Sequence, residues 1–230
     1  MFIGHFAVAF AAKPAAPRTS LGTLFVASTL VDLLWPVFLL LGWEQVRITQ
    51  SANPFLTLDF THYPWSHSLL MGIAWGAAFG ALYLALTPYS FGAIVVALLV
   101  PSHWVLDLIV HQPDLPLYPG GTARLGLGLW NSPTATMIVE GVMFLAGVTI
   151  YARATQPRDR IGRYGLWALV VFLIVLYLVS SFSPPPPSVK ALAWSAMIGW
   201  PLTLWPWWVD RHRVPATKAD SASVAARSPS

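Results

Sequence analysis

Long apolar stretches alternate with short polar segments along most of the chain. Six stretches are long enough to cross a bilayer as helices, which takes about 20 residues each; they cover residues 21–43, 67–86, 90–111, 134–151, 164–182 and 189–209. An apolar segment at residues 1–12 comes before them and is too short to span. The pattern predicts an all-α, polytopic membrane helix bundle with about six transmembrane helices and a short N-terminal half-inserted helix.

The composition supports a membrane protein. Of 230 residues, 56% are apolar and only 10% are charged, whereas an ordinary soluble domain has about 25% charged residues. So few charges could not cover a surface in water, which excludes a water-soluble globular protein. The chain has no cysteine, which excludes disulfide scaffolds, thiol nucleophiles and cysteine zinc sites. We interpret the net charge of +4 as loop charge, not as a nucleic-acid-binding surface.

Basic residues are unevenly distributed between the loops. With the N-terminus inside, ten lie on the cytoplasmic side: Lys13, Arg18, Arg153, Arg158, Arg160, Arg163, Arg211, Arg213, Lys218 and Arg227. Only Arg47, Arg124 and Lys190 lie outside. The positive-inside rule therefore predicts a multi-pass protein with both termini cytoplasmic. We expect a single integral-membrane domain at residues 1–210, with its polar site within 1–150, and a disordered cytoplasmic tail at 211–230.

The clearest chemical signal lies near the end of the third apolar stretch. His103 and Asp107 are four residues apart and share a helix face, so one imidazole and one carboxylate can hold a single metal ion. His111 follows on nearly the same face, but about 12 Å along the axis from His103 at 1.5 Å per residue. We therefore expect His111 to serve a second ion, contact substrate or cap the helix. A purely structural Asp107–His111 pair near the helix C-terminus is the alternative.

Other ionisable residues in apolar segments gather in the first half of the chain. Asp32 lies mid-span in the first stretch, His67 opens the second with Ser66 as its expected N-cap, and His5 lies in the N-terminal segment. Such residues are costly in a membrane and usually mark a functional site. Glu140, mid-span in the fourth stretch, is expected to accept a hydrogen bond from a ligand histidine.

These side chains predict a metal centre of nitrogen and oxygen ligands. The expected ligands are Asp32, His67, His103 and Asp107, and His5 and His111 are the candidate catalytic residues. Imidazole and carboxylate ligands without thiols suit one or two divalent ions, most simply zinc, with manganese or iron as alternatives.

The same residues resemble a known family. The matching positions are Gly4-His5, Asp32, His67-Ser68 and His103 with Asp107. They resemble the YdjM-like family of bacterial inner-membrane proteins, which are regarded as metal-dependent hydrolases and are distantly similar to zinc-dependent phospholipase C. The resemblance covers roughly residues 1–150 and implies a hydrolase of the bacterial inner membrane. The phospholipase also uses a His-x-x-x-Glu, which is absent here, so we expect one or two ions and not three.

The sequence therefore favours a membrane-embedded metal-dependent hydrolase. Its expected substrate is a phosphoester in a lipid or lipid-like molecule near the outer leaflet, and no nucleic-acid partner is expected. Two alternatives remain open: a non-catalytic membrane protein with a structural metal site, and a proton-coupled transporter that uses the His/Asp cluster as a relay.

Overall fold

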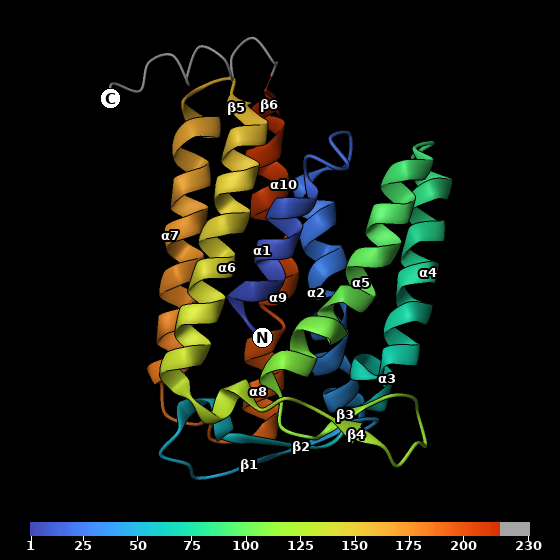
Figure 1. The fold of residues 1–230 in the computed structure, drawn as a ribbon, viewed down its shortest axis with the longest axis vertical. Coiled ribbons are helices and arrows are strands. Elements are labelled where there is room, and N and C mark those ends of the chain that lie inside the picture. The colour runs from blue at the N-terminus through green and yellow to red at the C-terminus, as the bar shows by residue number, and fades with distance from the viewer. Residues whose placement is uncertain (217–230) are drawn as a thin grey trace.

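The computed structural model describes residues 1–216 of the chain. Five helices in this part are long and apolar enough to cross a membrane: α2 (Leu21–Leu41), α4 (Leu69–Leu86), α5 (Ser90–Val110), α6 (Pro133–Ala154) and α7 (Arg160–Phe182). They run side by side in one bundle (Figure 1). This agrees with the predicted all-α bundle, with five continuous candidate spans where the sequence predicted about six.

Local sequence explains where most of these helices begin. In each case an oxygen of the residue before the helix accepts the backbone N–H three residues later, which satisfies one of the free N–H groups of the first turn. These caps are Ser20 on α2, Ser68 on α4, Ser132 on α6 and Asp159 on α7. Gly42 ends α2 in the left-handed conformation, with a φ of 74° that suits glycine.

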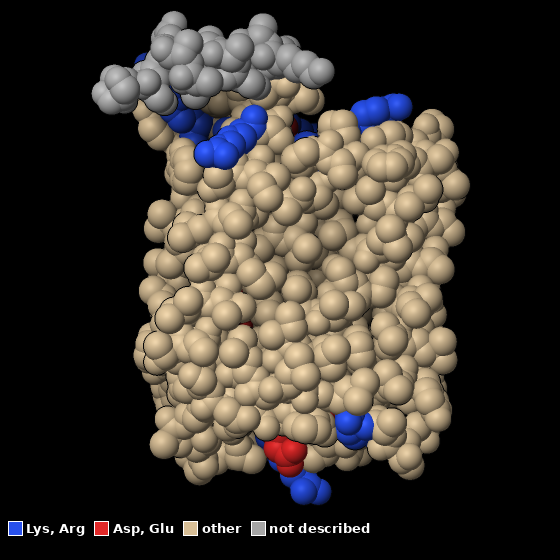
Figure 2. Space-filling view, viewed as in Figure 1, with Lys and Arg blue, Asp and Glu red and all other residues tan. Residues whose placement is uncertain are grey.

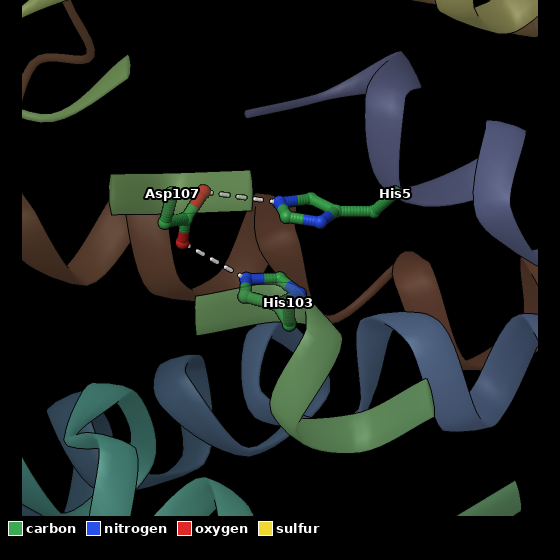
Figure 3. A group of neighbouring side chains, drawn as sticks. All are labelled: His5, His103 and Asp107. Carbon is green, nitrogen blue, oxygen red and sulfur yellow. Dashed lines mark hydrogen bonds and ion pairs between the residues drawn. The ribbon is translucent and has the colours of Figure 1, made fainter. Parts of the chain in front are cut away.

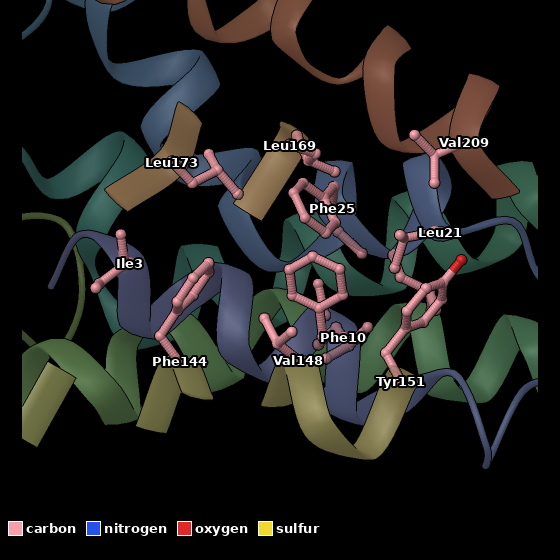
Figure 4. Close-up of a cluster of buried hydrophobic side chains, with 14 of the residues drawn as sticks. Ile3, Phe10, Leu21, Phe25, Phe144, Val148, Tyr151, Leu169, Leu173 and Val209 are labelled. Carbon is pink, nitrogen blue, oxygen red and sulfur yellow. The ribbon is translucent and has the colours of Figure 1, made fainter. Parts of the chain in front are cut away.

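Helix α1 (Ile3–Ala12) lies inside the bundle and packs against α2, α5 and α6. Phe10 of α1 meets Phe25 of α2 edge to face at 5.0 Å and Tyr151 of α6 at 5.4 Å between ring centroids. Figure 4 shows these rings within the apolar core. A side chain at Gly147 would collide with the backbone of Ala7, so this glycine allows α1 and α6 to touch. The short apolar segment is thus a helix that does not span, as predicted.

The pair α4 and α5 forms a second close contact. Gly72, Gly76 and Gly80 lie one turn apart on the face of α4 toward α5. A Cβ atom at Gly76 would overlap the carbonyl oxygen of Ala97. Small residues at such spacing let two helix backbones approach in a membrane. Elsewhere α4 carries large exposed side chains such as Leu70 and Ile73.

The expected sixth span is not one continuous helix. Residues 189–209 fall into α8 (Val189–Ala196), α9 (Gly199–Leu202) and α10 (Leu204–Arg211), which follow one another along the bundle (Figure 1). Met197, Ile198 and Thr203 keep right-handed helical angles, but several hydrogen bonds shorten to an i−3 partner. Pro201 has no N–H to donate and interrupts the regular ladder, which explains the breaks.

Short antiparallel strand pairs occupy the two ends of the bundle. At one end, β1 (Gln45–Ile48) pairs with β2 (Leu58–His62) and β3 (Leu115–Pro116) pairs with β4 (Arg124–Leu125). This end, called the loop end below, also holds the short helices η1 (Pro54–Leu56), α3 (Pro64–His67) and η2 (Leu129–Asn131).

The other end, called the basic end below, carries β5 (Thr155–Pro157) paired with β6 (Arg213–Pro215). The sequence placed Arg213–Pro215 in a disordered tail that starts at residue 211. That prediction is wrong for this segment, because its backbone pairs with the segment after α6. Residues 217–230 of the expected tail lie outside the described residues.

Charged side chains on the face in Figure 2 lie at the two ends, and a broad uncharged band separates them. Large apolar residues such as Leu98, Val142 and Phe182 are exposed on the long helices. An exposed apolar belt of this kind is compatible with a protein surrounded by lipid.

Candidate metal centre

Asp107 of α5 lies at the centre of a buried group of histidines in the half of the bundle nearer the loop end. Its Oδ2 atom is 3.1 Å from Nε2 of His103, 3.8 Å from Nε2 of His111 and 4.0 Å from Nε2 of His67. Its Oδ1 atom is 3.1 Å from Nε2 of His5. Figure 3 shows the His5 and His103 rings against the two oxygens of this carboxylate. One carboxylate therefore faces four imidazoles.

Asp32 of α2 supplies the second carboxylate. Its Oδ1 atom lies 3.3 Å from Nε2 of His67 and 3.5 Å from Nε2 of His103. Unlike the buried side chain of Asp107, that of Asp32 is 44% exposed and lines a cavity. The cluster therefore opens into the cavity mainly at Asp32, although Asp107 and His67 also line the cavity wall.

Two of the imidazoles are oriented by hydrogen bonds on their other nitrogen. Nδ1 of His103 lies 2.9 Å from the backbone oxygen of Ser28 and donates to it. The Ser66 hydroxyl donates to Glu44 Oε2 at 2.7 Å, so the Oγ atom of Ser66 accepts from Nδ1 of His67 at 2.6 Å. Both rings therefore carry their proton on Nδ1 and turn the lone pair of Nε2 toward the carboxylates, as metal-binding histidines do.

The Glu44 carboxylate is itself held firmly at the loop end. It accepts the backbone N–H groups of Trp65 and Ser66 at 2.8 and 2.7 Å, at the first turn of α3. Burial raises the pKa of Glu44, and its hydrogen bonds to Ser66 work in the opposite direction. Glu44 thus fixes the Ser66 hydroxyl, and the oxygen of this hydroxyl accepts the hydrogen bond from His67.

His111 has a comparable arrangement. Its Nδ1 lies 2.9 Å from Oδ1 of Asp114, which also accepts the Tyr63 hydroxyl at 2.7 Å. Burial, with Asp114 alongside, raises the pKa of Tyr63 well above its usual value, so this hydroxyl stays a donor. The His111 ring packs on Trp130 at 4.1 Å between centroids. These contacts leave Nε2 of His111 free to face Asp107.

His5 is bound differently from the other three imidazoles. Its ring stacks on that of His103, with centroids 3.5 Å apart and planes 5° from parallel. Its Nδ1 is buried and has no hydrogen-bond partner among the described residues. The amino nitrogen of Met1 also contacts Asp107 Oδ1. His5 thus contacts Asp107 and His103.

The arrangement needs a proton or a metal ion between its acceptor atoms. Nε2 of His103 is buried without a hydrogen-bond partner in the described structure, and it faces carboxylate oxygens that are themselves acceptors. Lone pairs that face one another in a buried site are unfavourable unless a proton or metal ion lies between them. Two sets have ligand atoms within 4.8 Å of one another: His5, His103 and Asp107, and Asp32, His67 and His103. The residues therefore fit a divalent metal ion.

The structure brings all six predicted site residues together. The separation of about 12 Å along the helix axis was expected to keep His111 and His103 from sharing one ion, and neither of the two sets of ligand atoms includes His111. His111 follows the last helical residue and has extended backbone angles. Its side chain reaches back, so that Nε2 atoms of both residues lie within 4 Å of the same Asp107 oxygen.

Two expectations about neighbouring residues were wrong. Glu140 binds no histidine; it accepts the backbone N–H groups of Phe2 and Gly4 and so holds the start of α1. Ser66 does not cap the second long helix, because His67 ends α3 and Ser68 caps α4.

Sequence reasoning missed the residues behind the imidazoles, namely Ser28, Glu44, Tyr63 and Asp114. Only Asp114 had a usable signal, because it follows His111 by three residues in a tight turn. Ser28 acts through its backbone, and Glu44 is 22 residues from Ser66, so no local pattern indicates either.

Comparison of the chain with protein-family models, with curated proteins and with solved structures found no match.

Proposed function

We propose that the protein is a membrane-embedded, metal-dependent hydrolase that cleaves a phosphoester in a lipid or lipid-like substrate. The observation that carries this proposal is the set of three imidazoles that each donate through Nδ1 to a fixed acceptor and present Nε2 to shared carboxylates. A purely structural pair would need only one such contact. The activity implied by the resemblance to the YdjM-like family agrees with this proposal.

Asp32, His67, His103 and Asp107 would hold the ion, and zinc is the simplest candidate for nitrogen and oxygen ligands. When bound, the ion would lower the pKa of a water molecule and polarise a phosphoryl oxygen. A second ion would find its ligands at His5, His103 and Asp107, whose ligand atoms lie within 4.8 Å of one another, and it would displace the Met1 amino group from Oδ1 of Asp107.

His111 is the proposed general base. Its Nδ1 proton is donated to Asp114, so Nε2 can accept a proton from water at the cluster and Asp114 can stabilise the imidazolium that forms. The Asp114 carboxylate is held by the Tyr63 hydroxyl, which keeps the ring in one orientation. His5 would help to hold Asp107 or complete the second site.

We place the protein in the bacterial inner membrane, with the basic end in the cytoplasm. Lys13, Arg153 and Arg158 lie in the segments at that end, and the excess of positive charge supports this orientation. The centre then lies in the half of the bilayer that includes the outer leaflet.

Metal content and turnover test the proposal together. Purified protein should contain about one or two zinc equivalents by elemental analysis, and it should cleave a phosphodiester such as bis(4-nitrophenyl) phosphate. Chelation should stop turnover and added zinc should restore it. His103→Ala should remove both metal and activity, whereas His62→Ala should change neither, because His62 is an exposed imidazole outside the cluster.

The outcomes separate the alternatives. Metal without turnover on any phosphoester would leave a structural site, in which the ion only joins α1, α2 and α5. Protein that binds no metal would contradict the proposal and favour the proton-coupled transporter.

A further inference from the structure

A large cavity begins at the metal centre and extends away from it. Its volume is about 580 Å³, within the range of about 300–1,000 Å³ that is typical of sites for small organic ligands. Asp32, His67 and Asp107 line one part of it, and apolar side chains such as Phe25 and Leu176 line much of the rest. A ligand that fills this space needs a polar group at one end and an apolar body.

The cavity is bounded by α7 on one side and by α8 and α9 on another. Ser180 and Ser183 at the end of α7 line the cavity and are exposed, as are Ser195 and Ile198 of the α8–α9 segment. Helices α8 and α9 pack on α2, whereas α10 packs on α7. The walls therefore part on the flank of the bundle, next to residues of the exposed apolar belt such as Val179 and Phe182.

Two buried polar groups in the cavity wall have no partner within the described structure. They are the hydroxyl of Tyr177 and Nε1 of Trp35. Buried tyrosine and tryptophan donors normally find an acceptor, and the other buried tyrosines, Tyr63, Tyr83 and Tyr151, all have one. Two unused donors beside a metal centre are suited to oxygen atoms of a bound ligand.

We propose that this cavity binds a glycerophospholipid that enters from the bilayer between α7 and the α8–α9 segment. One acyl chain lies against Phe25 and Leu176, the phosphate lies at the metal centre, and Tyr177 and Trp35 donate to its ester or phosphate oxygens. The proposal rests on the proposed function, because it names the substrate class of the same site. It adds the entry path and two specificity-determining residues.

Photolabelling tests the lipid site without any need for turnover. The probe is phosphatidylglycerol with a diazirine near the end of one palmitoyl chain, supplied to zinc-loaded protein in nanodiscs of dioleoylphosphatidylcholine. Mass spectrometry should map the label to cavity residues on α2, α7 and α9. Label spread evenly over the lipid-facing side chains of α4 and α6 would overturn the proposal.

A matched pair of variants on α7 sharpens this test. Leu176→Trp fills the cavity and should reduce cavity labelling at least fivefold. Val175→Trp adds the same side chain at an exposed neighbour that does not line the cavity, and it should leave labelling unchanged. Equal labelling of both variants would contradict an acyl chain at this position.

Tyr177→Phe tests recognition of the polar group. Loss of one buried hydrogen bond should weaken phosphatidylglycerol labelling by about three- to tenfold. Labelling by hexadecane that carries the same diazirine should not change, because this probe has no acceptor. Tyr164→Phe, at an exposed position on the same helix, is the control. Equal losses for both probes would show that Tyr177 only shapes the cavity.

The two proposals can fail separately. Cavity labelling without phosphoester turnover would sustain the lipid site and contradict the hydrolase. Turnover of a water-soluble phosphodiester without cavity labelling would sustain the hydrolase and contradict the lipid site.

Discussion

Two aspartates at opposite ends of the bundle, the buried Asp107 and the partly buried Asp210, have opposite surroundings. Asp210 of α10 is enclosed by donors: Lys13 Nζ at 2.6 Å, the backbone N–H of Leu21 at 3.1 Å and the Tyr151 hydroxyl at 2.9 Å. Asp107 is surrounded mainly by imidazoles, of which His103, His67 and His111 direct lone pairs toward it.

The difference separates a structural contact from a binding site. The Asp210 carboxylate has its hydrogen bonds within the protein and joins α1, α2, α6 and α10, so it needs no further group. At the Asp107 cluster the amino nitrogen of Met1 contacts Oδ1, but the Nε2 atoms of His67, His103 and His111 face Oδ2 without a donor between them. Ser28, Ser66 and Asp114 hold the three imidazoles in this orientation. The number of hydrogen-bond donors around each carboxylate therefore distinguishes the structural contact at Asp210 from the candidate binding site at Asp107.

The largest effect should follow from Asp107→Asn. The amide removes a charge that faces four imidazoles, so bound metal should fall below detection and phosphoester turnover should be lost. Asp59→Asn, at an exposed position in β2, should leave both unchanged. Elemental analysis and a turnover assay decide the matter, and full metal content in Asp107→Asn would mean that this carboxylate is not a ligand.

Asp210→Ala should affect folding instead of metal. It leaves the buried Lys13 ammonium without its counter-charge, and breaking a buried ion pair costs about 3–5 kcal/mol. Thermal unfolding in detergent should shift to a clearly lower temperature, while metal content per folded protein stays as in the wild type. Loss of metal with unchanged stability would contradict the assignment of Asp210 to a structural role.

Asp114→Asn probes the residue behind His111. The weaker acceptor should lower turnover by about 10- to 100-fold, the range expected when a residue behind a metal-site histidine is replaced. The ion held by His67 and His103 should remain. Its effect should exceed that of Tyr63→Phe, which removes only one hydrogen bond to Asp114. Loss of all metal from Asp114→Asn would instead make His111 a ligand of the same ion.

The sequence predicted the membrane bundle and the residues of the cluster because both depend on local or compositional signals. Helix length follows from apolar run length, and buried ionisable residues stand out in apolar segments. The groups behind the imidazoles could not be predicted, since Glu44 and Ser28 approach only after α2, α3 and α5 have packed. The breaks at Met197 and Thr203 were missed because apolar run length does not report the loss of a hydrogen bond at Pro201.

The His212–Asp159 pair at the basic end should show the smallest effect of all, and this effect should depend on pH. Asp159 Oδ1 accepts the Gly162 N–H at 2.8 Å and Oδ2 pairs with His212 Nδ1 at 2.6 Å.

The hydrogen bond from Gly162 lowers the pKa of this exposed carboxyl, and His212 lowers it further. Its folded pKa is therefore below its unfolded value of about 3.9. Its contribution to stability is present above that value and is lost as pH falls through the folded pKa. The melting temperature of Asp159→Asn should lie slightly below that of the wild type at pH 6, and the difference should vanish once the pH falls below the folded pKa. Metal content should not change, because this pair does not present several free lone pairs to one ion. A difference in melting temperature that persists in acid would show that the charge of Asp159 does not cause the loss of stability.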